Sequence, residues 1–171
     1  LIEVLMKLGY DIEEYLVDPT DPWIGIPNAR LRYYLSARKL ESGDDMPQYT
    51  GTIFKSFEEV AGPAPSTHKL RTISEFIDEK EVEDPQYLVP TKYLTEYKNY
   101  RHDITWPSST RSTTFTKAYG SKHIIGTGSF LQTRNLNLQY QNDDPAALTL
   151  GLRFFTPMEI ARLHGYPLRK E

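Results

Sequence analysis

The sequence predicts an α+β fold, in which the end of a doubly wound sheet precedes a small mixed domain. Residues 1–39 have the order helix, strand, loop, strand, which is typical of the edge of a layered sheet. Residues 106–150 are rich in hydroxyl side chains and punctuated by glycine, which favours loops and short strands. Residues 156–165 carry the start and stop signals of a short helix. We therefore expect two domains, residues 1–39 and residues 40–171.

The predicted sheet edge contains one helix and two strands. Three leucines on one helical face, followed by Gly9 at a typical capping position, predict that residues 1–8 end a helix. Residues 10–17 and 33–37 are rich in aromatic and branched side chains, which predicts strands. The proline-rich residues 18–29 would connect them, and the first strands of the sheet would lie upstream of the chain.

Three short helices are predicted in the second domain. Thr72 followed by Glu75 matches a capping box for a helix that continues through residue 77, and aromatic residues after Pro90 indicate another. The third is the clearest, because Thr156 is a good N-cap, proline fits the first helical position and Glu159 completes a capping box. We interpret this helix as a scaffold; direct substrate contact by a surface Arg162 is the alternative.

Composition is that of a globular chain and excludes several classes of site. The chain has 171 residues, of which 39% are hydrophobic and 25% charged. No apolar run approaches the roughly 20 residues that span a bilayer, so no membrane partner is expected. Cysteine is absent and the four histidines lack metal-binding spacing, which predicts no metal. The absence of cysteine suits a reducing compartment, so we expect a cytoplasmic protein, with the nucleus as a second location.

The net charge of −3 conceals an uneven distribution. Residues 40–90 contain eleven Asp or Glu and four Lys or Arg, a net charge of −7. Residues 101–134 contain five Lys or Arg and a single Asp, a net charge of +4. Nucleic acid responds to the local field, so the basic stretch is a candidate phosphate-binding face.

The stretch that begins at Gly25 places Arg30 and Arg32 one residue apart at the mouth of a predicted buried strand. Because side chains alternate along a strand, both guanidinium groups can face the same edge of a site. An ion pair with carboxylates at the sheet edge is the alternative. The stretch resembles the Gly-x-Pro-Gln-x-Arg-x-Arg motif of cytosine-5 methyltransferases, with Asn28 where most members have Gln.

Two further stretches extend this resemblance. Residues 152–167 are similar to the ninth conserved motif of the same enzymes. Residues 114–120, with the Gly-Thr-Gly-Ser-Phe-Leu-Gln stretch at 126–132, resemble an element of the type-two DNA-methyltransferase homologues, which are tRNA(Asp) cytosine-5 methyltransferases. That element begins with Cys in the family and with Thr114 here, which puts any role of the cysteine in doubt.

The resemblance implies S-adenosylmethionine-dependent methylation of an anticodon-loop cytosine, position 38 of tRNA(Asp). It also implies a Rossmann-like methyltransferase sheet, whose end would be residues 1–39. The family attacks cytosine with a thiolate, but this chain has no cysteine, no Glu-Asn-Val motif and no glycine-rich cofactor loop. We therefore interpret the chain as the C-terminal portion of the enzyme, with a target-recognition domain. Its partners would be tRNA and the missing N-terminal catalytic domain, which would bind most of the cofactor, and the chain alone should be inactive.

The resemblance also assigns candidate site residues. Arg32 would donate to O2 of the target cytosine and stabilise the charge that develops in the ring, while Arg30 would hold the loop or a nearby phosphate. The basic stretch supplies side chains of the types that contact phosphates and stack on bases. These RNA-binding candidates are Arg111, Thr116, Lys117, Tyr119 and Lys122. A solvated surface with the tyrosine packing inward is the alternative.

Two other functions stay open. The first is methylation of DNA, against which the Phe-Thr-Lys-x-Tyr-Gly element argues. The second is a non-catalytic module that binds nucleic acid or protein, since the chain lacks the nucleophile.

Overall fold

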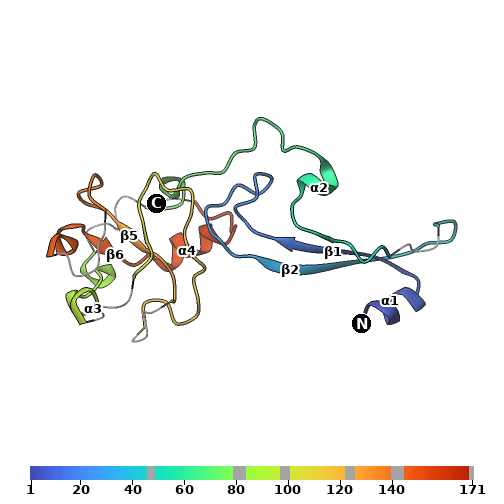
Figure 1. Ribbon diagram of the computed structural model, residues 1–171, viewed down its shortest axis with the longest axis horizontal. Helices are drawn as coiled ribbons and strands as arrows, with labels where there is room; N and C mark the ends of the chain where they lie inside the picture. Colours follow the sequence, from blue (N-terminus) through green and yellow to red (C-terminus); the bar gives the residue numbers. More distant parts are fainter. Residues whose placement is uncertain (46–48, 79–83, 97–100, 122–125, 140–144, 170–171) are drawn as a thin grey trace.

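The computed structural model describes residues 1–45, 49–78, 84–96, 101–121, 126–139 and 145–169. Figure 1 shows an elongated molecule in which a long hairpin and its flanking helices extend from a lobe that contains the C-terminal half. Among these residues, no helix is long and apolar enough to cross a membrane.

The N-terminal half forms a three-stranded sheet. Helix α1 (Ile2–Lys7) leads into β1 (Tyr10–Val17), which pairs antiparallel with β2 (Arg32–Lys39) and parallel with β3 (Ile53–Phe54). The order is β2-β1-β3. The predicted helix and both strands are confirmed, and Gly9 follows the helix at a positive φ of 75°.

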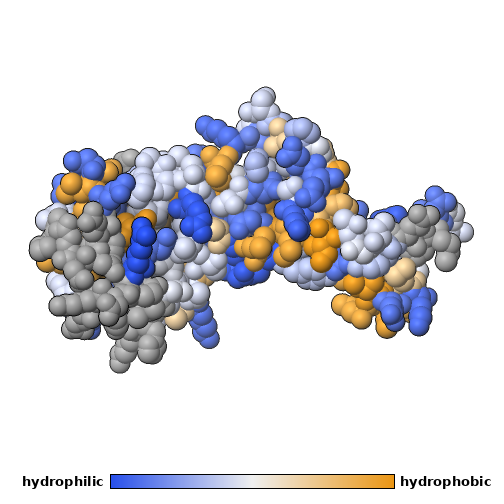
Figure 2. Space-filling model, viewed as in Figure 1, coloured by the Kyte–Doolittle hydropathy of each residue, from blue (hydrophilic) through white to orange (hydrophobic). Residues whose placement is uncertain are grey.

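Strand β2 differs from the prediction in length and in burial. It is longer than 33–37 because every residue of β1 has a pairing partner across the hairpin. The expectation of a buried strand is wrong for this chain: seven of its eight residues are exposed. Figure 2 shows apolar side chains exposed along this hairpin and around α1. The exposed large hydrophobic residues of α1, β2 and β3 and of the residues next to them are Leu1, Val4, Leu8, Leu31, Tyr33, Tyr34 and Ile53.

Short elements connect the hairpin to the second sheet. They are α2 (Glu58–Ala61), the 3₁₀ turns Ile73–Glu75 and Pro85–Tyr87, and α3 (Thr91–Glu96). The capping box at Thr72 is present, since its N–H donates to the Glu75 carboxylate at 3.1 Å. The helix predicted there is only one 3₁₀ turn and stops before Phe76, whose side chain enters the core.

The second sheet has the order β4-β5-β6, from β4 (Ile104–Thr105), β5 (Phe130–Gln132) and β6 (Leu152–Arg153). Strands β4 and β5 are parallel, whereas β5 and β6 are antiparallel. A 3₁₀ helix (Pro145–Thr149) precedes β6, and α4 (Pro157–Leu163) follows it. The predicted loops and short strands are confirmed for the described residues between 106 and 150, and so is the final helix.

Two clusters of buried side chains form the core of the lobe. The larger joins Ile26 from the loop after β1 to side chains from the 3₁₀ turn, β5 and α4. The smaller surrounds Phe130 and Phe154, and Tyr119 packs against both clusters. Residues on both sides of position 40 therefore share one core.

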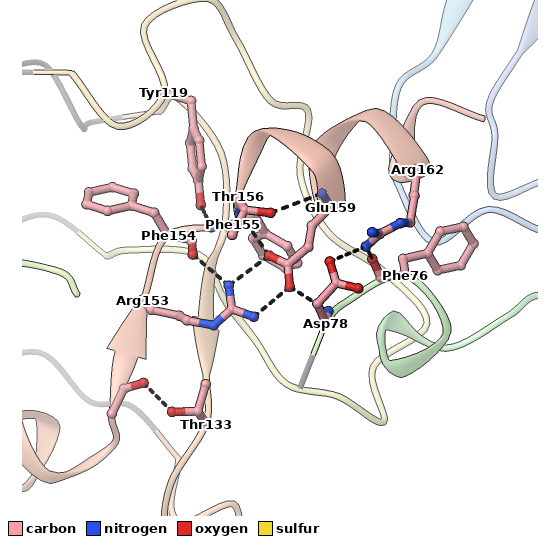
Figure 3. A network of polar contacts seen from close by, with 11 residues as sticks. Phe76, Asp78, Tyr119, Thr133, Arg153, Phe154, Phe155, Thr156, Glu159 and Arg162 are labelled. Atoms are coloured by element: carbon pink, nitrogen blue, oxygen red, sulfur yellow. Dashed lines mark hydrogen bonds and ion pairs between the residues drawn. The ribbon is translucent and has the colours of Figure 1, made fainter. Parts of the chain in front are cut away.

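Helix α4 is fixed by a buried network of charged groups (Figure 3). The guanidinium of Arg153 forms two bonds of 2.7 Å with the carboxylate of Glu159, and both side chains have zero exposure. Glu159 also accepts the N–H of Thr156 at 2.9 Å, which completes the predicted capping box. Arg162 pairs with Asp78 at 2.6 Å, and the N–H of Asp78 donates to Glu159 at 3.0 Å. Arg162 is thus buried rather than on the surface, because its counter-charge lies inside the lobe, and this supports the scaffold interpretation.

Candidate nucleic-acid interface

The three motifs of the sequence meet in the structure. The N–H of Ala29 donates to the carbonyl of Ser112 at 2.8 Å, and the N–H of Ser112 donates to that of Pro27 at 2.9 Å. Further along, the hydroxyl of Thr114 donates to the carbonyl of Ala29 at 2.6 Å. The side chain of Asn28, which is fully buried, donates to the carbonyl of Leu163 at the end of α4, at 3.0 Å. Segments 85 and 135 positions apart are thereby joined.

A glycine makes this meeting possible. Gly25 has φ = +69°, a conformation that costs little only for glycine. A Cβ at this position would lie 2.5 Å from the carbonyl oxygen of Lys69, so any other residue would push the segments around Gly25 and Lys69 apart. The carbonyl of Gly25 instead accepts the N–H of Arg71 at 3.0 Å. The glycine of the first motif therefore has a packing reason that is independent of any substrate.

An open hollow of about 370 Å³ lies where the first and third motifs meet. Its wall is made of hydroxyl groups, glycine backbone, one guanidinium and one carboxylate, that of Asp103. The lining residues are Ala29, Asp103, Arg111, Thr113, Thr114, Thr116, Gly126 and Gly128. We call this space the motif hollow. Thr114 stands where the resembling family has cysteine, and its hydroxyl holds the wall to the first motif.

The two arginines of the first motif have different surroundings. Arg30 is partly buried, and its Nη1 donates to the carbonyl of Phe115 at 3.5 Å, a long contact beside the motif hollow. Arg32 is exposed at the start of β2, and its Nη1 donates to the carbonyl of its neighbour Leu31 at 2.7 Å. In the part of the chain that the structure describes, neither arginine forms an ion pair, so the sheet-edge ion pair of the alternative interpretation is not observed.

The structure brings together three of the predicted RNA-binding residues. Arg111 and Thr116 line the motif hollow, and Lys117 follows directly in sequence. All three side chains are exposed. The N–H of Thr116 donates to the carbonyl of Thr127 at 2.9 Å, which fixes the backbone at this point of the wall. Lys122 lies outside the described residues.

Tyr119 is a correction to the predicted base-stacking set. Its hydroxyl donates to the carbonyl of Ser129 at 2.6 Å and accepts the N–H of Phe155 at 2.9 Å. The ring contacts Phe115 and Phe154 edge to face, with centroids 5.0 and 5.4 Å away, and burial raises the pKa of the hydroxyl. The ring packs inward because Gly128 leaves room for it: a Cβ there would lie 2.7 Å from the ring. Tyr119 is therefore a core residue that joins two segments.

Sequence reasoning missed one polar contact in the wall. The hydroxyl of Ser129 accepts the N–H of Thr113 at 2.8 Å and donates to the carboxylate of Asp103. This serine is fully buried, so Asp103 is held toward the interior on one side. Asp103 is the single acidic residue of the basic stretch, and this alone could have suggested that it has a structural partner. The partner itself could not be found from the sequence, because Ser129 is 26 positions away.

The described residues do not offer a cofactor cradle. S-adenosylmethionine is typically held where a strand passes through a glycine-rich turn into a helix. In the described ranges, β3 and β6 each lead into a helix, but no glycine stands in either turn. The residues present therefore do not fit this group.

Comparison with known proteins shows homology along almost the whole chain. No protein-family model matches it. Over 98% of its length it is 31% identical to the human "tRNA (cytosine(38)-C(5))-methyltransferase", of which it covers 57%. It is 29% identical to a "DNA (cytosine-5)-methyltransferase" of Dictyostelium discoideum, with 98% of this chain and 50% of that protein covered. The crystal structure of the S. pombe Dnmt2 methyltransferase matches with a TM-score of 0.75 and 26% identity, over 97% of this chain and 47% of that one.

The chain is thus homologous to Dnmt2-type tRNA cytosine-5 methyltransferases over 98% of its length. Its α+β fold with small mixed sheets matches their structures. The chain spans about half the length of the curated relatives that it matches.

Proposed function

On the basis of this homology, we propose that the chain is the C-terminal, target-recognition part of a tRNA (cytosine-5) methyltransferase that acts on the anticodon-loop cytosine 38 of tRNA(Asp). The observation that carries the proposal is the contact between the first motif and the segment around residues 112–128 at the motif hollow, with Arg111 and Thr116 in its wall. The segments that form this hollow are far apart in the sequence, so its geometry depends on the fold of the whole lobe.

The motif hollow has the chemistry of a phosphate and sugar contact. The guanidinium of Arg111 and the nearby ammonium of Lys117 supply positive charge in a stretch whose net charge is +4. Hydroxyl groups and backbone amides complete the wall, and such groups make most contacts between proteins and nucleic-acid backbones. Asp103 adds one negative charge to the wall, and its carboxylate is held on one side by the hydroxyl of Ser129.

The two arginines suit different roles. Arg32 is bound only to the adjacent carbonyl among the described contacts, so its guanidinium can exchange that bond for O2 of a target cytosine. There it would stabilise negative charge that develops as the thiolate of the catalytic domain adds to the ring. Arg30, which contacts the third motif, would hold the loop in place.

Residues 1–39 would form the edge of the catalytic domain and residues 40–171 the recognition domain. The exposure of β2 and of the apolar residues on α1 supports a docking surface on residues 1–39, since large exposed apolar patches usually mark interaction sites, whereas Ile26 of the connecting loop packs into the core of the lobe. The catalytic domain would cover these surfaces and supply the nucleophile and the cofactor site. Without it, the chain would be inactive. The cytoplasm, with the nucleus as a second location, would be its place of action.

A salt series on the complete enzyme tests the proposal. Arg111→Gln and Lys117→Gln should each lower the slope of log affinity against log salt by roughly one unit, because each removes one phosphate contact. Arg38→Gln is the matched control: it removes the same charge from the hairpin, where Arg38 pairs with Asp44, and should leave the slope unchanged. The ligand is the anticodon stem-loop of tRNA(Asp), measured by filter binding.

Turnover on the same stem-loop tests the role of Arg32. Arg32→Ala should slow methyl transfer by about 30- to 1,000-fold, as for other transition-state donors, with affinity nearly unchanged. Wild-type turnover would show that Arg32 does not contact the base. Unchanged salt slopes in both hollow variants would mean that RNA docks elsewhere.

DNA is the second candidate substrate, favoured by the name of the Dictyostelium relative. An equal-length DNA duplex in the same series separates the two. Tighter binding and faster methylation of the duplex would establish the DNA alternative.

A further inference from the structure

A second hollow, of about 330 Å³, lies beside the motif hollow. Asp103 lines both spaces, so they are neighbours on one surface. The residues that line the second one are Arg101, His102, Asp103, Ile104, Trp106 and Gln139. No role described so far uses Trp106, although 39% of its surface is exposed.

Trp106 stands on a firmly anchored turn. Its N–H donates to the hydroxyl of Ser109 at 3.1 Å, and the N–H of Ser109 returns to the carbonyl of Trp106 at 2.9 Å. This turn is also bonded to the 3₁₀ helix Ile73–Glu75. The N–H of Ile73 donates to the carbonyl of Ser109 and the N–H of Ser74 donates to the carbonyl of Pro107, each at 2.8 Å. An exposed aromatic ring on such a support loses little conformational entropy when it binds a ligand.

The turn is also linked to the motif hollow. The hydroxyl of Thr105 donates to the carbonyl of Arg111 at 3.0 Å, which fixes the residue before the tryptophan against the arginine of the first space. The backbone segments that carry Trp106 and Arg111 are therefore held together.

The other walls carry polar groups at the surface, the carboxylate of Asp103 on the side of the motif hollow, and a neutral histidine below. Arg101 and Gln139 are exposed and offer a guanidinium and an amide. His102 is buried against Phe130, with ring centroids 5.1 Å apart, and its Nε2 lies 3.1 Å from the carbonyl of Tyr93. Burial lowers the pKa of His102, so its imidazole is neutral and does not add a second positive charge to the floor of the hollow.

We propose that this second hollow binds an unpaired nucleobase of the RNA, stacked on Trp106, with Arg101 near its phosphate and Gln139 at its base edge. The ligand class follows from the walls: an exposed aromatic ring binds any base by its face, an amide can bond a base edge, and a guanidinium suits a phosphate. A base in a duplex cannot reach the ring, so the nucleotide is single-stranded. The inference rests on the proposed function, because it places this nucleotide next to the one in the motif hollow.

The test uses the complete enzyme and the anticodon stem-loop with each loop base removed in turn. Trp106→Ala should weaken binding of the intact stem-loop by about 5- to 140-fold, the range for one stacked base. Trp106→Phe should retain most of the affinity, since a smaller ring still stacks. For one of the abasic stem-loops, the affinity of the wild type should fall to the affinity that Trp106→Ala has for the intact stem-loop. Removal of the same base should not weaken binding to Trp106→Ala any further. Circular dichroism melting shows whether each variant is folded.

Arg111→Gln separates this inference from the proposed function. If Arg111→Gln weakens binding while Trp106→Ala binds within twofold of the wild type, the motif hollow stands and the second hollow holds no base. A loss in Trp106→Ala that is the same for every abasic stem-loop also overturns the inference, because the tryptophan then acts only through the fold. If neither variant weakens binding, the proposed function fails as well.

Discussion

Glu159→Gln should destabilise the protein strongly, because it leaves the charge of Arg153 buried without a counter-charge. The carboxylate of Glu159 accepts four bonds: two of 2.7 Å from Arg153, one of 2.9 Å from Thr156 and one of 3.0 Å from Asp78. Glutamine keeps the shape but turns one acceptor oxygen into a donor that faces the guanidinium. Breaking one side of a buried ion pair costs about 3–5 kcal/mol.

The effect is large enough for thermal melting. In a protein of this size, 1 kcal/mol shifts the melting temperature by about 2–4 °C, so the variant should melt roughly 6–20 °C below the wild type. Urea unfolding gives the free energy itself by linear extrapolation. Arg38→Gln is again the matched control: its pair with Asp44 is exposed, and loss of such a pair changes stability by less than about 1 kcal/mol.

A double variant tests the cause. Arg153→Met removes the stranded charge, so Arg153→Met with Glu159→Gln should be more stable than Glu159→Gln alone by about 0.5–3 kcal/mol, the usual range for coupled neighbours. A single variant within 1 kcal/mol of the wild type would refute the reasoning. It would mean that water reaches the pair and that α4 does not depend on it.

Two further predictions concern side chains with hydrogen-bonded hydroxyl groups. Hydrogen bonds from Tyr33 and Tyr49 lower the pKa of Glu14 below 4.5, so the contribution of Glu14 to stability is present above pH 4.5 and is lost as the pH falls through its pKa in the folded protein. The hydrogen bond to Glu14 raises the pKa of Tyr33 to about 12. The contribution of Tyr33 to stability is therefore lost as the pH rises from 10 to 12. The free energy of unfolding against pH should therefore flatten at the acid end in Glu14→Gln and at the alkaline end in Tyr33→Phe, and curves parallel to the wild type would contradict this. Tyr119→Phe should cost about 1–3 kcal/mol in urea unfolding, because the N–H of Phe155 loses its acceptor. Its RNA salt slope should equal that of the wild type, and a changed slope would return Tyr119 to the RNA-binding set.

The sequence predicted the elements whose signals are local. The capping box of Thr156 and Glu159 lies within one helical turn, and every signal from the N-cap to the final glycine agrees. The strand at 10–17 was also predicted to the residue, because aromatic and branched side chains recur from its first residue to its last. The exposure of β2 could not be predicted, because composition indicates a strand but not what covers it.

The interior of the lobe depends on contacts between distant residues. Arg162 looks like a surface arginine in the sequence, and only the approach of Asp78, 84 positions away, makes its burial favourable. From the sequence, the ring of Tyr119 could either stack on a base or pack inward. The room left by Gly128 favours inward packing. The predicted motifs did identify the segments that meet around the motif hollow. Their backbone bonds, such as Ala29 to Ser112, could not be inferred from residue types.

The bond from Asn28 to Leu163 closes a chain segment of 135 positions. The entropy lost in closing such a loop grows only with the logarithm of its length, so doubling the loop costs about 0.6 kcal/mol. The alignment with the human relative runs over 229 positions, more than the 171 residues of this chain, so that relative contains residues that have no counterpart here. The residues between the first and last motifs can therefore differ in number between relatives at little cost, while the hydrogen bond between Asn28 and Leu163 stays as it is.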